Sequence, residues 1–300
     1  MPHDHHHHHP AEESIKVAFF LNFGFALIEA VGGFFTNSIA IMADALHDLG
    51  DSVTLFISWR LEKLSSRSGD QRYSYGYKRY SLLSAFIGSL ILIAGAAIVI
   101  IESVKRISDP QPTNAAGMLI LSLLGITANG IAAFRAGKGK NLNSRIIYWH
   151  LLEDVLGWAA VLVVSVVLMF WDIHILDPIL SIAISAFVLI NVVKNLKQTT
   201  NLFLQGVPAG IQIDEIEKTV LADDKVDGVH HTHIWSLDGE HHVLTSHVVV
   251  CPDTKKEDIR RIKEIFRKLA VDFHLAHTTI EFEYVDGDCS MNNSEENENE

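Results

Sequence analysis

Two pairs of histidine and aspartate have the types and spacing of metal ligands. His47 and Asp51 are four residues apart in residues 39–59, IAIMADALHDLGDSVTLFISW, and His150 and Asp154 repeat this spacing in residues 148–159, YWHLLEDVLGWA. Residues four apart lie on one face of a helix, so each segment offers an imidazole beside a carboxylate. Two nitrogens and two oxygens suit a tetrahedral zinc ion, and the two segments together predict a zinc site.

Further carboxylates lie in the same apolar surroundings. Asp44 and Asp48 form a second four-spaced pair in the first segment, and spacing alone does not decide between the two pairs. Glu29 stands in the preceding apolar stretch, where it could support the metal site or carry a proton. An ionised carboxylate at membrane depth costs about 3 kcal/mol on the insertion scale, so this many of them indicate a function.

The segments that hold these residues are long and apolar. The mean hydropathy is +0.21 although the chain has 36 acidic and 24 basic residues, so charge and apolar residues must be segregated along it. Stretches of about 20 apolar residues are long enough to cross a bilayer. They predict an α-helical membrane domain within residues 14–204 with six spans, at 15–36, 39–60, 81–104, 118–135, 146–171 and 179–194.

Basic residues are concentrated in two connections, at residues 62–80 and 135–145. The positive-inside rule therefore predicts that both loops and both termini are cytoplasmic. The first apolar run lacks the features of a signal peptide. The two cysteines, Cys251 and Cys289, lie outside the spans and fit a reducing compartment, and the net charge of −12 argues against nucleic-acid binding.

The composition changes after residue 205, where a small soluble domain is expected to extend to residue 286. Periodicity predicts helices at 213–221 and 257–269 and strands at 228–236, 241–250 and 278–284. This order predicts an α+β, ferredoxin-like domain with its helices on one face of the sheet. Residues 1–13 form a histidine-rich tail, either a purification tag or a natural metal-collecting segment, and residues 287–300 read as a disordered acidic tail.

The soluble domain contains eight histidines, of which one pair stands out. If Asp238-Gly239 is a two-residue turn, Leu237 pairs with Glu240, and counting outward places His230 opposite His247. Two imidazoles so placed could share a metal. The alternative, histidines exposed on a polar sheet face, applies to most of the others.

The combined motifs resemble the cation diffusion facilitator family. They are the paired H-x-x-x-D, the run SIAIMADALHDLGD, the phrases KNLNSR and DPILSI, and GVHHTHIWSL, SHVVV and HTTIEFE near the end. The similarity covers residues 14–286 and is strongest to bacterial zinc efflux transporters of that family. It implies a multi-pass protein of the bacterial cytoplasmic membrane that exports zinc in exchange for protons and forms a homodimer through its cytosolic domains.

The resemblance also assigns residues. It implies that the transport ligands are His47, Asp51, His150 and Asp154, and that regulatory zinc binds at His230, His247 and Glu283. Relatives with a further site in the loop after the second span use histidines there, whereas this loop has Asp70 followed by tyrosines, so we expect no site.

Two other classes of function could also place metal ligands within a membrane domain. An intramembrane metallohydrolase would be expected to show H-E-x-x-H, and neither ligand segment has it, so no enzymatic activity is predicted. The sequence also lacks a phosphate-binding G-x-x-x-x-G-K-[ST] loop, so no nucleotide is expected. A membrane metal sensor that binds zinc without moving it remains open, and a flux measurement separates it from a transporter.

Overall fold

The computed structural model describes residues 9–138 and 142–284. Contacts between Cα atoms divide the chain into two compact units. The first unit comprises the residues up to 64 together with 83–197, and the second comprises 65–82 together with the residues from 198 onward. Each unit is described by itself.

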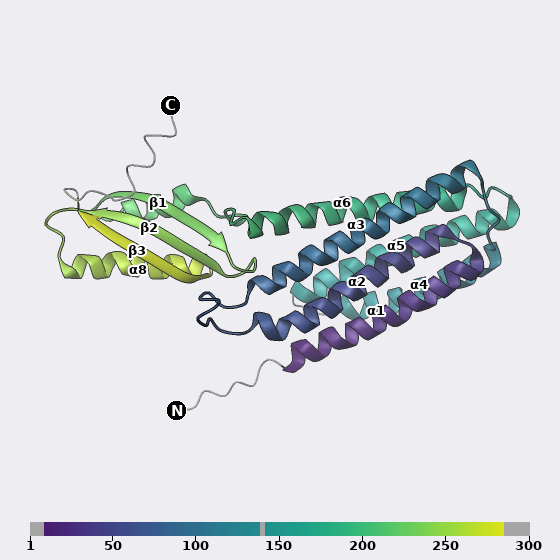
Figure 1. Cartoon of the computed structure of the whole chain (residues 1–300), viewed down its shortest axis with the longest axis horizontal. Coiled ribbons are helices and arrows are strands. Elements are labelled where there is room, and N and C mark those ends of the chain that lie inside the picture. The colour runs from purple at the N-terminus through teal and green to yellow at the C-terminus, as the bar shows by residue number, and fades with distance from the viewer. Residues whose placement is uncertain (1–8, 139–141, 285–300) are drawn as a thin grey trace. The chain divides into compact units, whose positions relative to one another are not determined.

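Six long helices supply the first unit (Figure 1): α1 His9–Thr36, α2 Ile39–Ser65, α3 Arg79–Ser108, α4 Ala115–Ala136, α5 Leu142–Phe170 and α6 Leu176–Phe203. Among the described residues, five of them contain a stretch long and apolar enough to cross a membrane, and the buried share of these stretches is only 22–28%. Apolar side chains therefore face outward, as expected for contact with lipid. A helical membrane domain with five apolar spans is confirmed.

The helix α2 is the predicted span that does not meet this criterion. Asp44, Asp48 and Asp51 interrupt its apolar part, and its last turns are charged. Several helices also extend beyond the predicted spans; α1 begins at His9 rather than residue 15, and α6 ends at Phe203 rather than 194. Hydropathy locates only the apolar part of a helix, whereas backbone hydrogen bonds continue into polar residues on either side.

A glycine sets the close packing of α4 against α5. A Cβ atom on Gly125 would lie 2.2 Å from the indole ring of Trp158, so only glycine leaves room for this ring. Trp158 is buried in a core with Ile41, Met118 and Val161. These contacts fix the face that α5 presents to the other helices.

Hydrogen bonds join the start of α2 to the start of α6. The carboxylate of Asp177 accepts hydrogen bonds from the hydroxyl of Ser38 and from the backbone N–H groups of Ile39, at 2.7 Å, and Ala40, at 3.3 Å. Ser181 donates to the carbonyl of Ile39 at 3.4 Å. From its place directly before Pro178, Asp177 is predicted to cap its own helix, α6, but it does not. It lies in the first turn of α6 and caps α2, a tertiary contact that the local sequence does not show.

The α3 helix joins the same cluster. The guanidinium of Arg106 donates to the carbonyl of Asn37 at 2.7 Å, and Ser103 donates to the hydroxyl of Ser181 at 3.1 Å. Three helix ends are therefore linked by polar groups, most of them buried, where each unmade hydrogen bond would be costly.

The second unit contains a three-stranded mixed sheet with two helices. Its elements are α7 Ile213–Leu221, β1 Val226–Ser236, β2 His242–Val250, α8 Lys256–Asp272 and β3 Leu275–Tyr284. Strand β2 lies in the centre, antiparallel to β1 and parallel to β3. Ile216, Leu244, Val248 and Phe266 are among the buried residues of the core that the helices form with the sheet. Because side chains alternate along a strand, His247 on β2 points to the opposite face.

The register of the β1–β2 hairpin places His230 opposite His247, as predicted, but the predicted turn was wrong. The last paired residues are Ser236 and His242, so the connection is longer than Asp238-Gly239, and His241 lies in it. An irregularity between His230 and His233 then shifts the register by one residue. This β-bulge compensates for the longer turn.

Candidate metal sites

The four predicted transport ligands meet between α2 and α5. Asp51 Oδ2 lies 3.7 Å from His47 Nε2 on its own helix and 3.7 Å from His150 Nε2 on the other. Asp154 Oδ2 lies 3.9 Å from His150 Nε2. The two imidazole rings are 6.3 Å apart between centroids. The carboxylate of Asp51 therefore stands between the two imidazoles, and the second carboxylate completes the group.

The group is more open in this structure than a site closed around one small cation. Zinc binds nitrogen and carboxylate oxygen at about 2.0–2.2 Å, so the ligand atoms of a tetrahedral ion are about 3.3–3.5 Å apart. Three nitrogen–oxygen separations are 3.7–3.9 Å, but among the described residues no three of these four side chains bring their ligand atoms within 4.8 Å of one another, so the group is wider than a shell closed around zinc. The chemistry of the set, two borderline nitrogens and two hard oxygens, suits zinc and neighbouring divalent metals.

A cavity of about 480 Å³ adjoins this group. His47, Asp51 and Asp154 line it, together with Asp44 and apolar residues of α5 and α6. Asp48 does not line it. Asp48 is 7% exposed, lies beside the buried carboxyl of Glu29, and its backbone carbonyl accepts a hydrogen bond from Asn22 at 2.9 Å. The competing pair Asp44 and Asp48 is thus split, with one carboxylate at the cavity and the other against α1.

The cavity has polar lining that the sequence reasoning missed. Asn191 and Asn195 of α6 and Glu153 of α5 border the same space. Asn191 and Asn195 are four residues apart on α6, and this spacing could have identified them. Amide groups on one helix face can supply both oxygen ligands and hydrogen-bond donors to this cavity.

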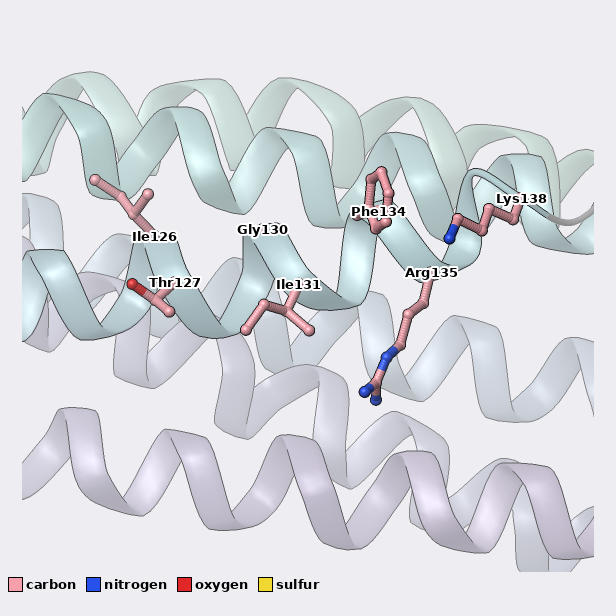
Figure 2. Close-up of a pocket in the computed structure, with 7 residues that line it drawn as sticks. All are labelled: Ile126, Thr127, Gly130, Ile131, Phe134, Arg135 and Lys138. Atoms are coloured by element: carbon pink, nitrogen blue, oxygen red, sulfur yellow. The ribbon is translucent and has the colours of Figure 1, made fainter.

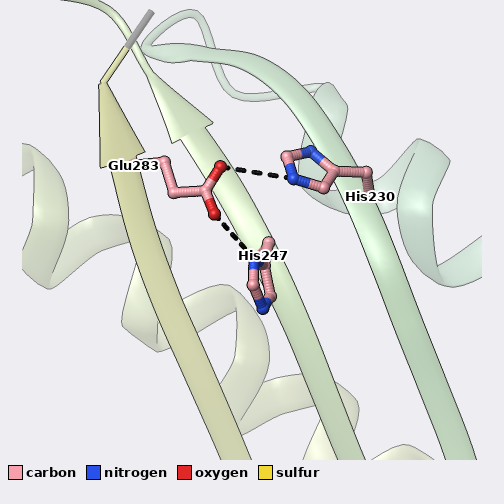
Figure 3. Close-up of side chains that lie close together, drawn as sticks. All are labelled: His230, His247 and Glu283. Carbon is pink, nitrogen blue, oxygen red and sulfur yellow. Dashed lines mark hydrogen bonds and ion pairs between the residues drawn. The ribbon is translucent and has the colours of Figure 1, made fainter. Parts of the chain in front are cut away.

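A tighter group of three lies on the second unit (Figure 3). His230, His247 and Glu283 each contribute one atom to a set whose members all lie within 4.8 Å of one another, and no other such group occurs among the described residues. Glu283 Oε1 is 2.6 Å from His247 Nδ1, and Glu283 Oε2 is 3.2 Å from His230 Nε2. The three side chains come from three different strands, so the folded sheet alone brings them together.

This group fits a metal in one further respect. The Nε2 atom of His230 is buried and makes no hydrogen bond among the described residues, although it lies close to the carboxylate. A cation would satisfy this nitrogen and also balance the charge of the carboxylate beside it. His231 adds a third imidazole nearby, with its ring centroid 5.0 Å from that of His230 and 5.3 Å from that of His247. His231 has a φ of 47° at the bulge, which turns it toward these rings.

Several other titratable groups of the second unit have structural roles. His241 pairs with Asp238 at 2.7 Å, and burial lowers the pKa of His242. Burial alone would raise the pKa of Asp238, but hydrogen bonds from the backbone N–H groups of His241 and Glu240 hold it below the usual value.

Asp70 lies in the connection from α2 to α3. Its carboxylate accepts hydrogen bonds from the backbone N–H groups of Tyr73 and Arg72 and from the hydroxyl of Tyr77. These bonds lower its pKa. The carboxylate of Asp70 therefore stabilises the loop in which it lies.

Comparison with known sequences gives the family. A sequence model described as the cation efflux transmembrane domain matches residues 15–204, which is more than half of the chain. A second, described as the cation efflux protein cytoplasmic domain, matches residues 208–285. The chain belongs to the cation efflux family, so the resemblance found in its motifs is confirmed, and it is a multi-pass membrane protein.

Relatives from bacteria match over most of their length. Zinc transporter ZitB of Pectobacterium atrosepticum is 31% identical, over 97% of this chain and 92% of the relative. The cadmium, cobalt and zinc/H(+)-K(+) antiporter of Bacillus subtilis is 29% identical, over 94% and 92%. The metal cation efflux system protein CzcD of Cupriavidus metallidurans is 32% identical, over 94% and 89%. The predicted similarity to bacterial zinc transporters is confirmed.

Proposed function

We propose that the protein exports zinc from the bacterial cytoplasm in exchange for protons, across the cytoplasmic membrane. The observation that carries this proposal is the meeting of His47, Asp51, His150 and Asp154 beside a cavity between apolar helices. Charged groups within a membrane domain are expensive and characteristic of ion pathways. The printed names of the relatives, a zinc transporter and a zinc/H(+)-K(+) antiporter, support the same substrate and exchange.

The proposal requires α2 to be a sixth span. Its 27 residues are long enough to cross a bilayer, since a span needs about 20. Its carboxylates face a cavity and the neighbouring α1 rather than lipid, which is how a membrane tolerates them. With six spans at residues 14–204, the basic loops and both termini are cytoplasmic, and residues 205–286 form a cytosolic domain. The order αββαβ supports the ferredoxin-like prediction for that domain.

Exchange with protons follows from the ligand chemistry. Zinc binds neutral imidazole and ionised carboxylate, so protons and zinc compete for the same four side chains. Histidine is the side chain whose ordinary titration lies near neutral pH, so the ambient pH on each side can decide which of the two is bound. A proton gradient can thereby drive zinc outward without nucleotide hydrolysis.

The cytosolic triad fits a regulatory role. His230, His247 and Glu283 would hold zinc from three strands, and binding to the folded domain would stabilise it. This would report cytosolic zinc to the transport domain. We place the homodimer contact in the same domain, on the basis of the family resemblance.

The test is zinc flux into liposomes that contain the full-length protein, with a pH gradient imposed and then reversed. Wild-type flux should follow the gradient, Asp51→Asn should reduce it to background, and Asp48→Asn should retain most of it because Asp48 lies outside the cavity. If wild-type protein binds zinc but moves none, the protein is a sensor. If Asp48→Asn abolishes flux while Asp51→Asn does not, the ligand assignment is wrong.

A further inference from the structure

A hollow on the outer face of α4 has the shape and charge of a lipid site. Figure 2 shows the side chains that line it, all from α4 and the two residues that follow it. The hollow has a volume of about 420 Å³ and is distinct from the cavity at the transport ligands. Gly130, Ile131, Phe134, Arg135 and Lys138 line it at helical spacing, so they share one face.

Gly130 forms the floor of the hollow. A Cβ atom built on this residue would meet no atom within 4 Å, so the missing side chain leaves open space at the surface. Ile126 and Ile131 border this space along the helix, and Phe134 closes it toward the helix end. The apolar lining suits a hydrocarbon chain.

Two cations stand at one end of the hollow. Arg135 is in the last turn of α4, and Lys138 follows two residues after the helix ends. The ammonium of Lys138 lies 4.3 Å from the centre of the Phe134 ring, which directs it back over the hollow. Within the described part of the chain, neither cation forms an ion pair with a carboxylate. A helix C-terminus alone explains basic residues here, but it does not explain the apolar hollow beside them.

The length of the hollow matches one leaflet. From Ile126 to Lys138 the rise of a helix is about 18 Å, and half of a hydrocarbon core is about 15 Å. An acyl chain beside Gly130 would therefore place its headgroup at the level of the two cations. Basic residues at the membrane surface attract anionic headgroups, by about 1 kcal/mol each.

We propose that this face of α4 binds an anionic phospholipid, with an acyl chain against Gly130 and Phe134 and the phosphate between Arg135 and Lys138. The proposal concerns lipid binding alone, so its test is independent of zinc flux. A second copy of the chain is the other occupant that an exposed membrane face could have.

Native mass spectrometry of the purified full-length protein tests this, with palmitoyl-oleoyl phosphatidylglycerol and the matching phosphatidylcholine as probes. Loss of both cations in the double variant Arg135→Gln/Lys138→Gln should weaken phosphatidylglycerol binding roughly 30-fold, which corresponds to about 2 kcal/mol. Phosphatidylcholine binding should change little. The matched control, Lys194→Gln/Lys197→Gln, removes two exposed cations from α6 and should have less than a threefold effect.

Filling the hollow gives an independent test. Gly130→Leu should weaken binding of the anionic lipid by tenfold or more without loss of thermal stability, because the new side chain has room and favours the helix. Gly24→Leu is the control, since a Cβ there also meets no atom within 4 Å. Unchanged lipid binding in Gly130→Leu, or an equal loss in the two charge variants, would overturn the proposal. A shift toward monomers in Gly130→Leu with lipid binding retained would assign the face to a second copy.

Discussion

The charge on Glu283 should strengthen zinc binding by the cytosolic domain about 100-fold. Its two oxygens lie 2.6 Å and 3.2 Å from imidazole nitrogens of His247 and His230, and its side chain is only 14% exposed. Removing a hydrogen-bond partner of a metal ligand typically costs 10–100-fold in affinity, so loss of a charged ligand should reach the upper end, about 100-fold. The change Glu283→Gln keeps the shape and removes the charge. Glu281→Gln is the matched control, because Glu281 is 64% exposed and 3.7 Å from His247.

A 100-fold loss of zinc affinity predicts a measurable change in how much zinc stabilises the domain against unfolding. At a zinc concentration 100 times the wild-type Kd, zinc binding stabilises the folded state by about 2.7 kcal/mol. The same concentration should stabilise Glu283→Gln by only about 0.4 kcal/mol. For a fragment of residues 205–286, which has its own core, the zinc-induced rise in Tm should fall from about 10–20 °C to about 2–3 °C. Calorimetric unfolding with and without zinc measures this. An equal loss in Glu281→Gln, or none in Glu283→Gln, would refute the assignment of Glu283 as a ligand.

Three further changes should have separate effects. His47→Asp replaces a nitrogen ligand with a hard oxygen, so competitive flux should shift from zinc toward manganese, and an unaltered ratio would show that His47 is not a ligand. Asp177→Ala removes the cap of α2 and should lower stability by about 0.5–2 kcal/mol in detergent unfolding, whereas the exposed Asp109→Ala should not. Arg261→Gln should lower the Tm of the 205–286 fragment at neutral pH. Its guanidinium lowers the pKa of Asp223, so this stabilisation is present above the ordinary aspartate pKa and lost as pH falls through the lowered one; a difference in Tm that persists at low pH would contradict it.

That His47 and Asp51, and likewise His150 and Asp154, lie side by side could be predicted because spacing on a helix is a local property. His47 and Asp51 share a face whatever surrounds them, and the second pair on α5 follows the same rule. The sequence could not separate Asp44 from Asp48, because that distinction depends on which neighbouring helix each one faces. The direction of Asp177 depends likewise on tertiary packing, since its partners lie 137 to 139 residues away.

In the soluble domain, the positions of the strands could be predicted, but the irregularities in their pairing could not. Strand periodicity located all three strands, but neither the bulge at His231 nor the length of the hairpin connection is encoded in alternation. The longer connection shifts the register by one residue and the bulge shifts it back, so the predicted pairing of His230 with His247 was correct. Glu283 was reached only through the family resemblance, because its proximity depends on the parallel pairing of β2 with β3, across an intervening helix.

The cluster at Asp177 should slow hydrogen exchange at the start of α2 and restrain relative movement of the helices there. Its carboxylate protects the amide hydrogens of Ile39 and Ala40, which at most helix starts are free to exchange with water. These two amides should therefore exchange as slowly as those inside the helix, in contrast to the frayed ends typical of membrane helices. With α2, α3 and α6 linked at this end, large relative displacement requires several buried hydrogen bonds to break together.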